Sequence, residues 1–158
     1  MTKAVVILPK RKVFDVAKMR GVITSTLNAT AKNIKVDFDV TTQTWDHTVK
    51  IEITSPSEYT REITVHDPIY AMLEVGTKAH IIAPKKPRGI LRFTTPFRSK
   101  TIPNEIRSRQ GSKGNTPVVA RVVHHPGTAP RLWSKAIKRK WDQQIGNIFQ
   151  RAIDSAAG

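Results

Sequence analysis

Cysteine is absent from the 158 residues of the chain, and aromatic residues make up only 6% of them. Without cysteine there is no disulfide framework and no thiolate chemistry, so a zinc site would have to be built from histidine and carboxylates. No apolar run approaches the roughly 20 residues that a helix needs to span a bilayer. We therefore expect neither a disulfide scaffold nor a membrane partner.

Acidic residues are scarce in the second half of the chain. Residues 71–158 carry 17 Lys/Arg and 4 Asp/Glu, which gives +13 of the total net charge of +15, whereas residues 1–70 carry 10 and 8. Between Lys78 and Lys140 the only acid is Glu105. Such an excess of positive charge attracts polyanions, namely DNA, RNA or an acidic protein surface. The same charge also serves solubility, so composition alone does not choose among these roles.

The length fits one domain over residues 1–158 with a single core. The first residues, MTKAVVILPKRK, are basic at both ends of a short apolar run and lack a cleavage site of small residues. We interpret residues 1–11 as an extended arm or edge strand and not as a signal peptide.

Hydrophobic periodicity predicts one helix and three strands in the first half. Apolar residues at three- and four-residue steps indicate an amphipathic helix over about 12–31. Period-two alternation predicts strands over 33–40, 48–54 and 58–65, with a turn at Ser55-Pro56-Ser57. Together these strands would form an antiparallel meander with one buried face.

The next segments begin with a short helix that Asp67 would cap, Pro68 would open and Gly76 would end. Short strands are expected over 80–84 and 89–93, around a turn.

A strand over 118–123 and a helix over about 131–152 are expected to complete the chain. Between Thr94 and Pro117 lies a long segment rich in Pro, Gly, Ser and cations, which we read as a functional or disordered loop. The predicted fold class is α+β, with an antiparallel sheet packed against long N- and C-terminal helices and a long basic loop at 94–117.

The residues that could carry chemistry are few. Adjacent His124 and His125 would point to opposite faces of a strand and could not easily share a metal. Asp37 and Asp39 on one predicted strand, with Glu52 across from them, could hold a metal ion for phosphodiester cleavage, but paired acids on a solvated sheet face are commonplace. The chain has no phosphate-binding glycine loop, no G-x-S-x-G and no H-E-x-x-H. We expect no enzyme, no metal site and no cofactor.

The long loop offers cations for polyanion contact, and the only aromatic residue among them is Phe97. Charge without aromatics suits contact with the phosphate backbone without reading of sequence. The alternative interpretation is a solvated flexible loop. The candidate DNA or polyanion contacts are Arg98, Lys100, Arg107, Arg109 and Lys113.

Two motifs, one ahead of the loop and one behind it, carry a resemblance. The first reads Y-A-x-x-x-E-x-G-T and is followed by a histidine, an apolar pair and a proline, and the second reads H-P-G-T-x-P-R at the head of the last helix. In this order, over residues 68–153, the pair resembles the neck and tail-completion proteins of tailed bacteriophages, of the lambda-like minor tail protein Z type. The matching residues are Tyr70, Ala71, Glu74, Gly76, Thr77, His80, Pro84, Leu91, Phe93, His125, Pro126, Gly127, Thr128, Pro130 and Arg131.

The resemblance implies a structural virion protein, assembled in the host cytoplasm, that forms a homo-oligomeric ring of six or twelve copies at the head–tail junction. Its implied partners are the head-completion or connector protein, the tail terminator and the tail tube, with genomic DNA passing through the lumen without sequence specificity. A closed ring requires two different faces on each subunit. The motif residues, together with Trp133, would form these interfaces, and Pro126 to Pro130 would turn the chain into the last helix.

A further expectation concerns Glu74, one of the few acids in a basic neighbourhood, which we expect to pair with Arg131. The rival function is a stand-alone basic nucleic-acid-binding module. Salt-dependent DNA binding by a monomer that never forms a ring would favour that rival.

Overall fold

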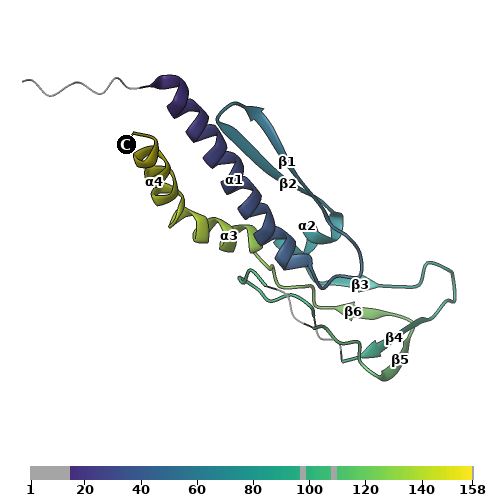
Figure 1. Cartoon of the computed structure of the whole chain (residues 1–158). Helices are drawn as coiled ribbons and strands as arrows, with labels where there is room; N and C mark the ends of the chain where they lie inside the picture. The colour runs from purple at the N-terminus through teal and green to yellow at the C-terminus, as the bar shows by residue number, and fades with distance from the viewer. Residues whose placement is uncertain (1–14, 97–98, 108–109, 158) are drawn as a thin grey trace, which may run out of the picture.

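The computed structural model describes residues 15–96, 99–107 and 110–157, and within them the chain has the predicted α+β fold. Figure 1 shows an elongated molecule with long helices at one end and a β-ribbon at the other. Its elements are α1 (Val16–Thr42), β1 (Lys50–Ser57), β2 (Thr60–His66), α2 (Pro68–Val75), β3 (His80–Ile82), β4 (Leu91–Thr95), β5 (Thr116–Ala120), β6 (Val123–His125), α3 (Trp133–Asp142) and α4 (Ile145–Ala157). The predicted arm at residues 1–11 lies outside the described residues.

Helix α1 runs far beyond the predicted end at residue 31, and the strand predicted over 33–40 is wrong. Asp15 caps the helix by accepting a hydrogen bond of 2.9 Å from the Lys18 N–H. Residues 33–40 alternate like a strand, but they are helical because their side chains contact other elements of the fold. Phe38 packs on the main core cluster, and Asp37 is buried against α3. Tertiary contacts therefore override a period-two pattern that local sequence favours.

Strands β1 and β2 form a two-stranded antiparallel hairpin on α1. The predicted meander of three strands is wrong, because its first segment belongs to α1. The turn lies at Glu58 and Tyr59, between the paired residues Ser57 and Thr60, and not at residues 55–57. The register shifts between Thr54 and Ser57, where Pro56 has no N–H to give to the ladder.

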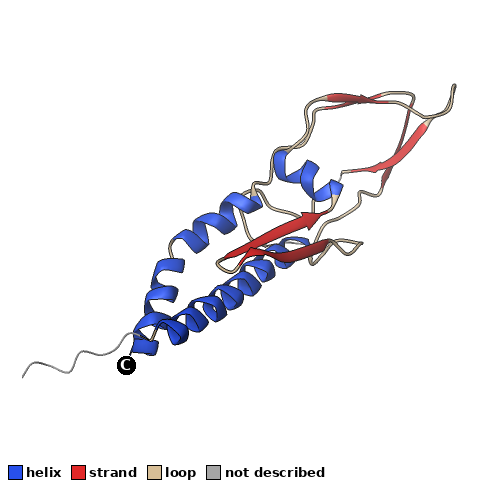
Figure 2. Cartoon of the chain, turned by 90° about the horizontal axis from the view of Figure 1, so that it is seen from above, coloured by secondary structure: helices blue, strands red, loops and turns tan. Residues whose placement is uncertain are grey.

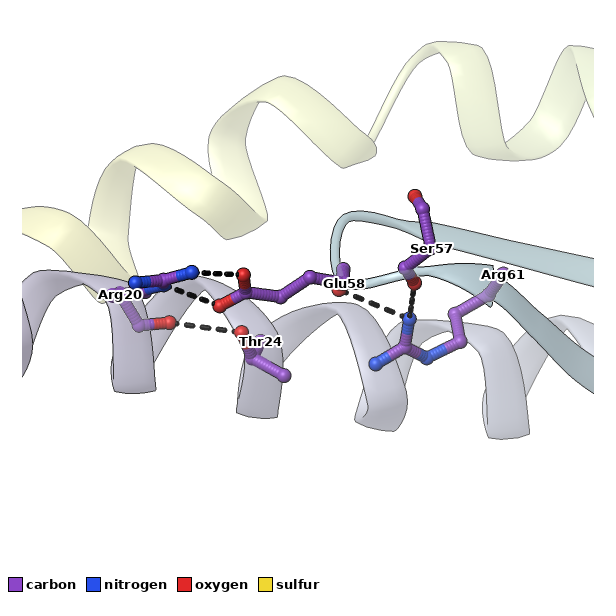
Figure 3. Close-up of polar contacts among 5 residues, drawn as sticks. All are labelled: Arg20, Thr24, Ser57, Glu58 and Arg61. Carbon is purple, nitrogen blue, oxygen red and sulfur yellow. Dashed lines mark hydrogen bonds and ion pairs between the residues drawn. The ribbon is translucent and has the colours of Figure 1, made fainter.

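Polar side chains attach this hairpin turn to α1 (Figure 3). The Arg20 guanidinium forms a two-point contact with the Glu58 carboxylate, with Nε 2.5 Å from Oε1. Arg61 donates from Nε to the Asn28 side chain at 2.6 Å and from Nη1 to the Ser57 and Glu58 carbonyl oxygens at 3.1 Å each. Because these contacts are exposed, they orient the hairpin and add little to its stability.

The remaining strands form one long two-stranded ribbon interrupted by a bend. β3 pairs with β6, and β4 pairs with β5, all antiparallel. The predicted strand 118–123 is therefore divided at Arg121 and Val122, which lie opposite the segment 83–90. Figure 2 shows these strands extending away from the helices. The loop that follows β4 is tied to the rest of the molecule by the Asn104 N–H, which donates to the Arg131 carbonyl oxygen at 2.7 Å.

The C-terminal helix is divided into α3 and α4 at Gln143 and Gln144, where one helix was predicted. Helix α3 buries Trp133, Ile137 and Trp141, while α4 continues along α1. The largest buried cluster joins α3 to the hairpin and α2. It comprises Val49, Ile51, Tyr70 and Trp133, with Phe38, Trp45, Ile63, Val65 and Leu73 packed against it.

Candidate functional site

The two sequence motifs meet in space at the base of the ribbon, where it joins the helical body. We call residues 76–80 and 125–131 the ribbon base. Thr77 and Thr128 exchange backbone hydrogen bonds of 3.0 and 3.1 Å, and the Thr77 hydroxyl also accepts from the Thr128 N–H at 2.9 Å. Motifs 51 residues apart are thus one structural unit.

Two glycines allow the backbones of the ribbon base to approach closely. Gly76 has φ 78° and Gly127 has φ 90°, conformations that residues with a Cβ rarely adopt. A Cβ on Gly76 would lie 2.6 Å from the Thr128 carbonyl oxygen, and one on Gly127 would lie 2.2 Å from the Thr77 carbonyl oxygen. Both distances are far below van der Waals contact, so the close approach of the two segments requires glycine at both positions.

Helix α2 begins as predicted, with Asp67 as its cap and Pro68 in its first turn. The Tyr70 N–H donates to Asp67 Oδ1 at 2.7 Å, and His47 Nε2 lies 2.9 Å from Oδ2. Partial burial pushes the pKa of Asp67 upward, but these hydrogen bonds outweigh that effect and leave its pKa below the ordinary value. Tyr70 itself is buried against Trp133, with ring centroids 4.8 Å apart, and this burial raises the pKa of its phenol.

Glu74 caps α3, and its expected pairing with Arg131 stays a prediction. Its carboxylate accepts from the Trp133 N–H at 2.8 Å, from the Ser134 N–H at 3.1 Å and from the Ser134 hydroxyl. Leu132, the residue before the helix, supplies no side-chain cap of its own, so an acid 58 positions upstream of it takes that role. Arg131 is joined to α2 through its backbone N–H, which donates to the Leu73 carbonyl oxygen at 2.9 Å.

Two histidines face each other across the ribbon base. His80 and His125 are register partners, and their rings stack with centroids 4.9 Å apart. His125 Nδ1 accepts from the Gly127 N–H at 3.0 Å, while His80 Nδ1 lies 2.9 Å from the Lys78 carbonyl oxygen. His124 pairs instead with Ile81. Among the described residues no group of three or more His, Asp or Glu side chains could hold a metal ion.

A cleft of about 880 Å³ separates the ribbon base from the returning loop. Its lining includes Trp45, His47, Thr128 and Arg131, together with Lys100 and Lys113. Pro126 and Pro130 lie exposed on the surface beside it. The cleft therefore combines residues of both motifs with two of the predicted loop cations.

The predicted loop cations do not form one free surface. Lys100 Nζ lies 2.6 Å from Asp46 Oδ1, a contact that lowers the pKa of Asp46, and Arg107 pairs with Glu105. Lys113 is exposed, and Arg98 and Arg109 lie outside the described residues. At least two of the five cations thus already neutralise acids of this chain.

The three acids considered for metal-dependent cleavage are dispersed among separate contacts. Asp37 accepts from Lys140 and Trp141, Asp39 pairs with Lys35 on the same helix, and Glu52 pairs with Lys50 and His66. The premise that Asp37 and Asp39 share a strand face is wrong, because both lie on α1.

Comparison with protein-family models, curated proteins and solved structures gives no match. Among the described residues, no helix combines the length and apolar character needed to cross a membrane. The sequence analysis overlooked a different set of cations, which lie on and beside β4 and β5 and outside the predicted loop contacts. The absence of any acid from residues 75–104 and 106–141 was the signal that could have identified them.

Proposed function

We propose that the chain is a structural subunit of a phage particle, which forms a ring at the head–tail junction around the DNA channel. The observation that supports this proposal most strongly is the ribbon base. The two motifs that carry the resemblance are distant in sequence, yet they form one rigid crossing through the Thr77–Thr128 bridge and two positive-φ glycines. A motif that fixes the direction of a protruding ribbon suits an assembly subunit, whose function depends on shape.

Exposed apolar side chains offer surfaces for contacts between subunits. Val75 on α2 is 73% exposed, and Ile81 on β3 and Val119 on β5 are each 63% exposed. Val75 and Ile81 lie next to the ribbon base and Val119 lies farther along the ribbon, and exposed apolar groups of this kind mark interaction sites. The unpaired edges of the ribbon strands add backbone groups that a neighbouring subunit could bind. In the proposed ring of six or twelve copies, the partners are the connector protein, the tail terminator and the tail tube.

The experiment compares Gly127→Ala with Gly21→Ala in particle assembly. A methyl group on Gly127 meets the Thr77 carbonyl oxygen, whereas one on Gly21 in α1 meets nothing within 4 Å. We expect purified particles to contain the Gly21→Ala chain as a ring visible by electron microscopy, and the Gly127→Ala chain to be absent. A wild-type chain missing from purified virions would refute the proposal.

The rival function, a nucleic-acid-binding module acting alone, is favoured by one observation, the unpaired cations of the ribbon. Sedimentation of the wild-type chain with and without its connector and tail partners separates the two functions. A chain that stays monomeric with every partner, and yet binds bulk DNA in a salt-dependent manner, would favour the rival.

A further inference from the structure

The segment that joins β3 to β4 projects at the end of the molecule opposite the helices (Figure 1). Together with the adjoining strands it forms what we call the outer ribbon, residues 83–95 and 116–122. Its loop is ordered by its own contacts. The Gly89 N–H donates to the Lys86 carbonyl oxygen at 3.0 Å, and a Cβ on Gly89 would lie 2.8 Å from Pro84 Cβ. Pro84 and Pro87 restrict the backbone further.

The outer ribbon carries five exposed cations and no acid. None of the five forms a hydrogen bond or an ion pair with any residue that the structure describes, whereas seven Lys and Arg residues elsewhere pair with a carboxylate of the chain. The five are Lys85, Lys86, Arg88, Arg92 and Arg121.

Strand register relates the positions of two of these cations, Arg92 and Arg121. Leu91 pairs with Ala120 in the β4–β5 ladder. Arg92 comes directly after Leu91 in the sequence, and Arg121 comes directly after Ala120 on the other side of the ribbon. Strand pairing stops between Ala120 and Val123, and Arg121 lies in this gap. On the other side of the ribbon the gap corresponds to the segment 83–90, and that segment contains Lys85, Lys86 and Arg88. The charges thus lie on β4, on the segment that joins β3 to β4 and on the bend between β5 and β6, and they are not a single run along the sequence.

We infer that the outer ribbon binds the phosphate backbone of duplex DNA. A two-stranded β-ribbon fits the major groove of B-DNA, and cations that lack acidic partners release counterions when they meet phosphates. The only aromatic residue of the outer ribbon is Phe93, so the surface is suited to backbone contact and not to stacking on bases. The inference deepens the proposed function and rests on it for the identity of the nucleic acid, the DNA of the channel.

The test measures binding of the full chain to a fluorescein-labelled 30-base-pair duplex by anisotropy between 50 and 200 mM salt. The variant K85Q/K86Q/R92Q is compared with K32Q/K135Q/R151Q, which removes the same charge from exposed positions on α1, α3 and α4. Each lost phosphate contact lowers the slope of log K against log salt by about 0.9, so the ribbon variant should lose roughly 2 to 3 in slope and bind at least about tenfold more weakly. The helix variant should stay within about threefold of wild type. Equal losses in both variants would overturn the inference.

A second comparison guards against misfolding of the triple variant. Arg88 has φ 59°, which glycine adopts freely, so Arg88→Gly removes one cation from a backbone that accepts the change. Asn104→Gly is its uncharged control, because Asn104 also has φ 59°. We expect the slope to fall by about 1 for Arg88→Gly and to stay unchanged for Asn104→Gly. Unchanged slopes in both would count against the ribbon as the DNA contact.

Competition with polyglutamate of equal total charge distinguishes DNA from an acidic protein. DNA carries about one charge per 1.7 Å of axis, so polyglutamate should compete at least about tenfold less well. Equal competition would refute the assignment to nucleic acid and indicate an acidic protein partner. Ribbon variants that still enter particles but bind duplex as wild type does would refute this inference and leave the proposed function intact. Chains that never enter particles, yet bind duplex through the ribbon, would refute the proposed function and leave this inference intact.

Discussion

Asp37 lies where α1 meets α3, and replacing it tests whether residues 33–40 are helical. Its carboxylate accepts from the buried Trp141 indole N–H at 2.7 Å and from Lys140 Nζ at 2.7 and 2.8 Å. Asp37→Ala leaves the indole N–H without an acceptor in a buried site. Asp37 therefore accepts the hydrogen bond of the Trp141 indole, whereas Asp39 pairs with Lys35 on the same helix.

The expected loss follows from these contacts. A hydrogen bond to a charged group contributes about 1.5–3 kcal/mol, and the Lys140 contact adds up to about 1 kcal/mol because the lysine side chain is 41% exposed. Asp37→Ala should therefore lower the free energy of unfolding by about 3 kcal/mol, and the melting temperature by roughly 6–12 °C. Asp37→Asn keeps one acceptor oxygen for Trp141 and should cost about 1 kcal/mol.

Urea denaturation followed by tryptophan fluorescence measures these losses, since Trp45, Trp133 and Trp141 together report unfolding. Asp39→Ala is the matched control, because its partner Lys35 is one helical turn away and both side chains are substantially exposed. We expect it to cost less than about 0.5 kcal/mol. Equal losses for Asp37→Ala and Asp39→Ala would refute the reasoning and restore the strand interpretation of this segment.

Three further predictions concern the ribbon base and its surroundings. Glu74→Ala should lower the free energy of unfolding by about 1–2 kcal/mol through loss of the α3 cap, measured by urea denaturation, whereas equal stability would show that Glu74 caps nothing. The pKa of Asp67 lies below its value in the unfolded chain, so the ionised carboxylate stabilises the fold above about pH 4 and this stabilisation is lost as the pH falls. Asp67→Asn should therefore reduce the fall in melting temperature between neutral and acid pH. A melting temperature that falls with pH as in the wild type would contradict this. Gly127→Ala should lower the free energy of unfolding by at least about 2 kcal/mol. Gly21→Ala, inside α1, should raise it by up to about 1 kcal/mol, and thermal unfolding of the two purified variants measures both effects.

Local chemistry was sufficient to predict several elements of this fold. Asp67, Pro68 and Gly76 marked the bounds of α2 because capping, the first helical turn and a positive φ each depend on a few adjacent residues. The hairpin strands followed from alternation, but the turn predicted at Ser55-Pro56-Ser57 is wrong, because the turn lies at Glu58 and Tyr59. The shortage of acids after residue 70 was likewise visible in the sequence, and it identified the basic half of the molecule.

Tertiary structure decided the features that depend on distant partners. Residues 33–40 alternate like a strand, but the contacts of Asp37 with α3 and of Phe38 with the core favour helix, and no local pattern contains those contacts. The acceptor that caps α3 comes from Glu74 on another helix, and spacing along the sequence does not reveal such a cap. Which cations remain unpaired was also fixed by folding, because Lys100 and Arg107 contact acids while the cations of the outer ribbon contact none in the described part of the chain. A sequence records how many charges a chain has, but the fold determines which of them are neutralised.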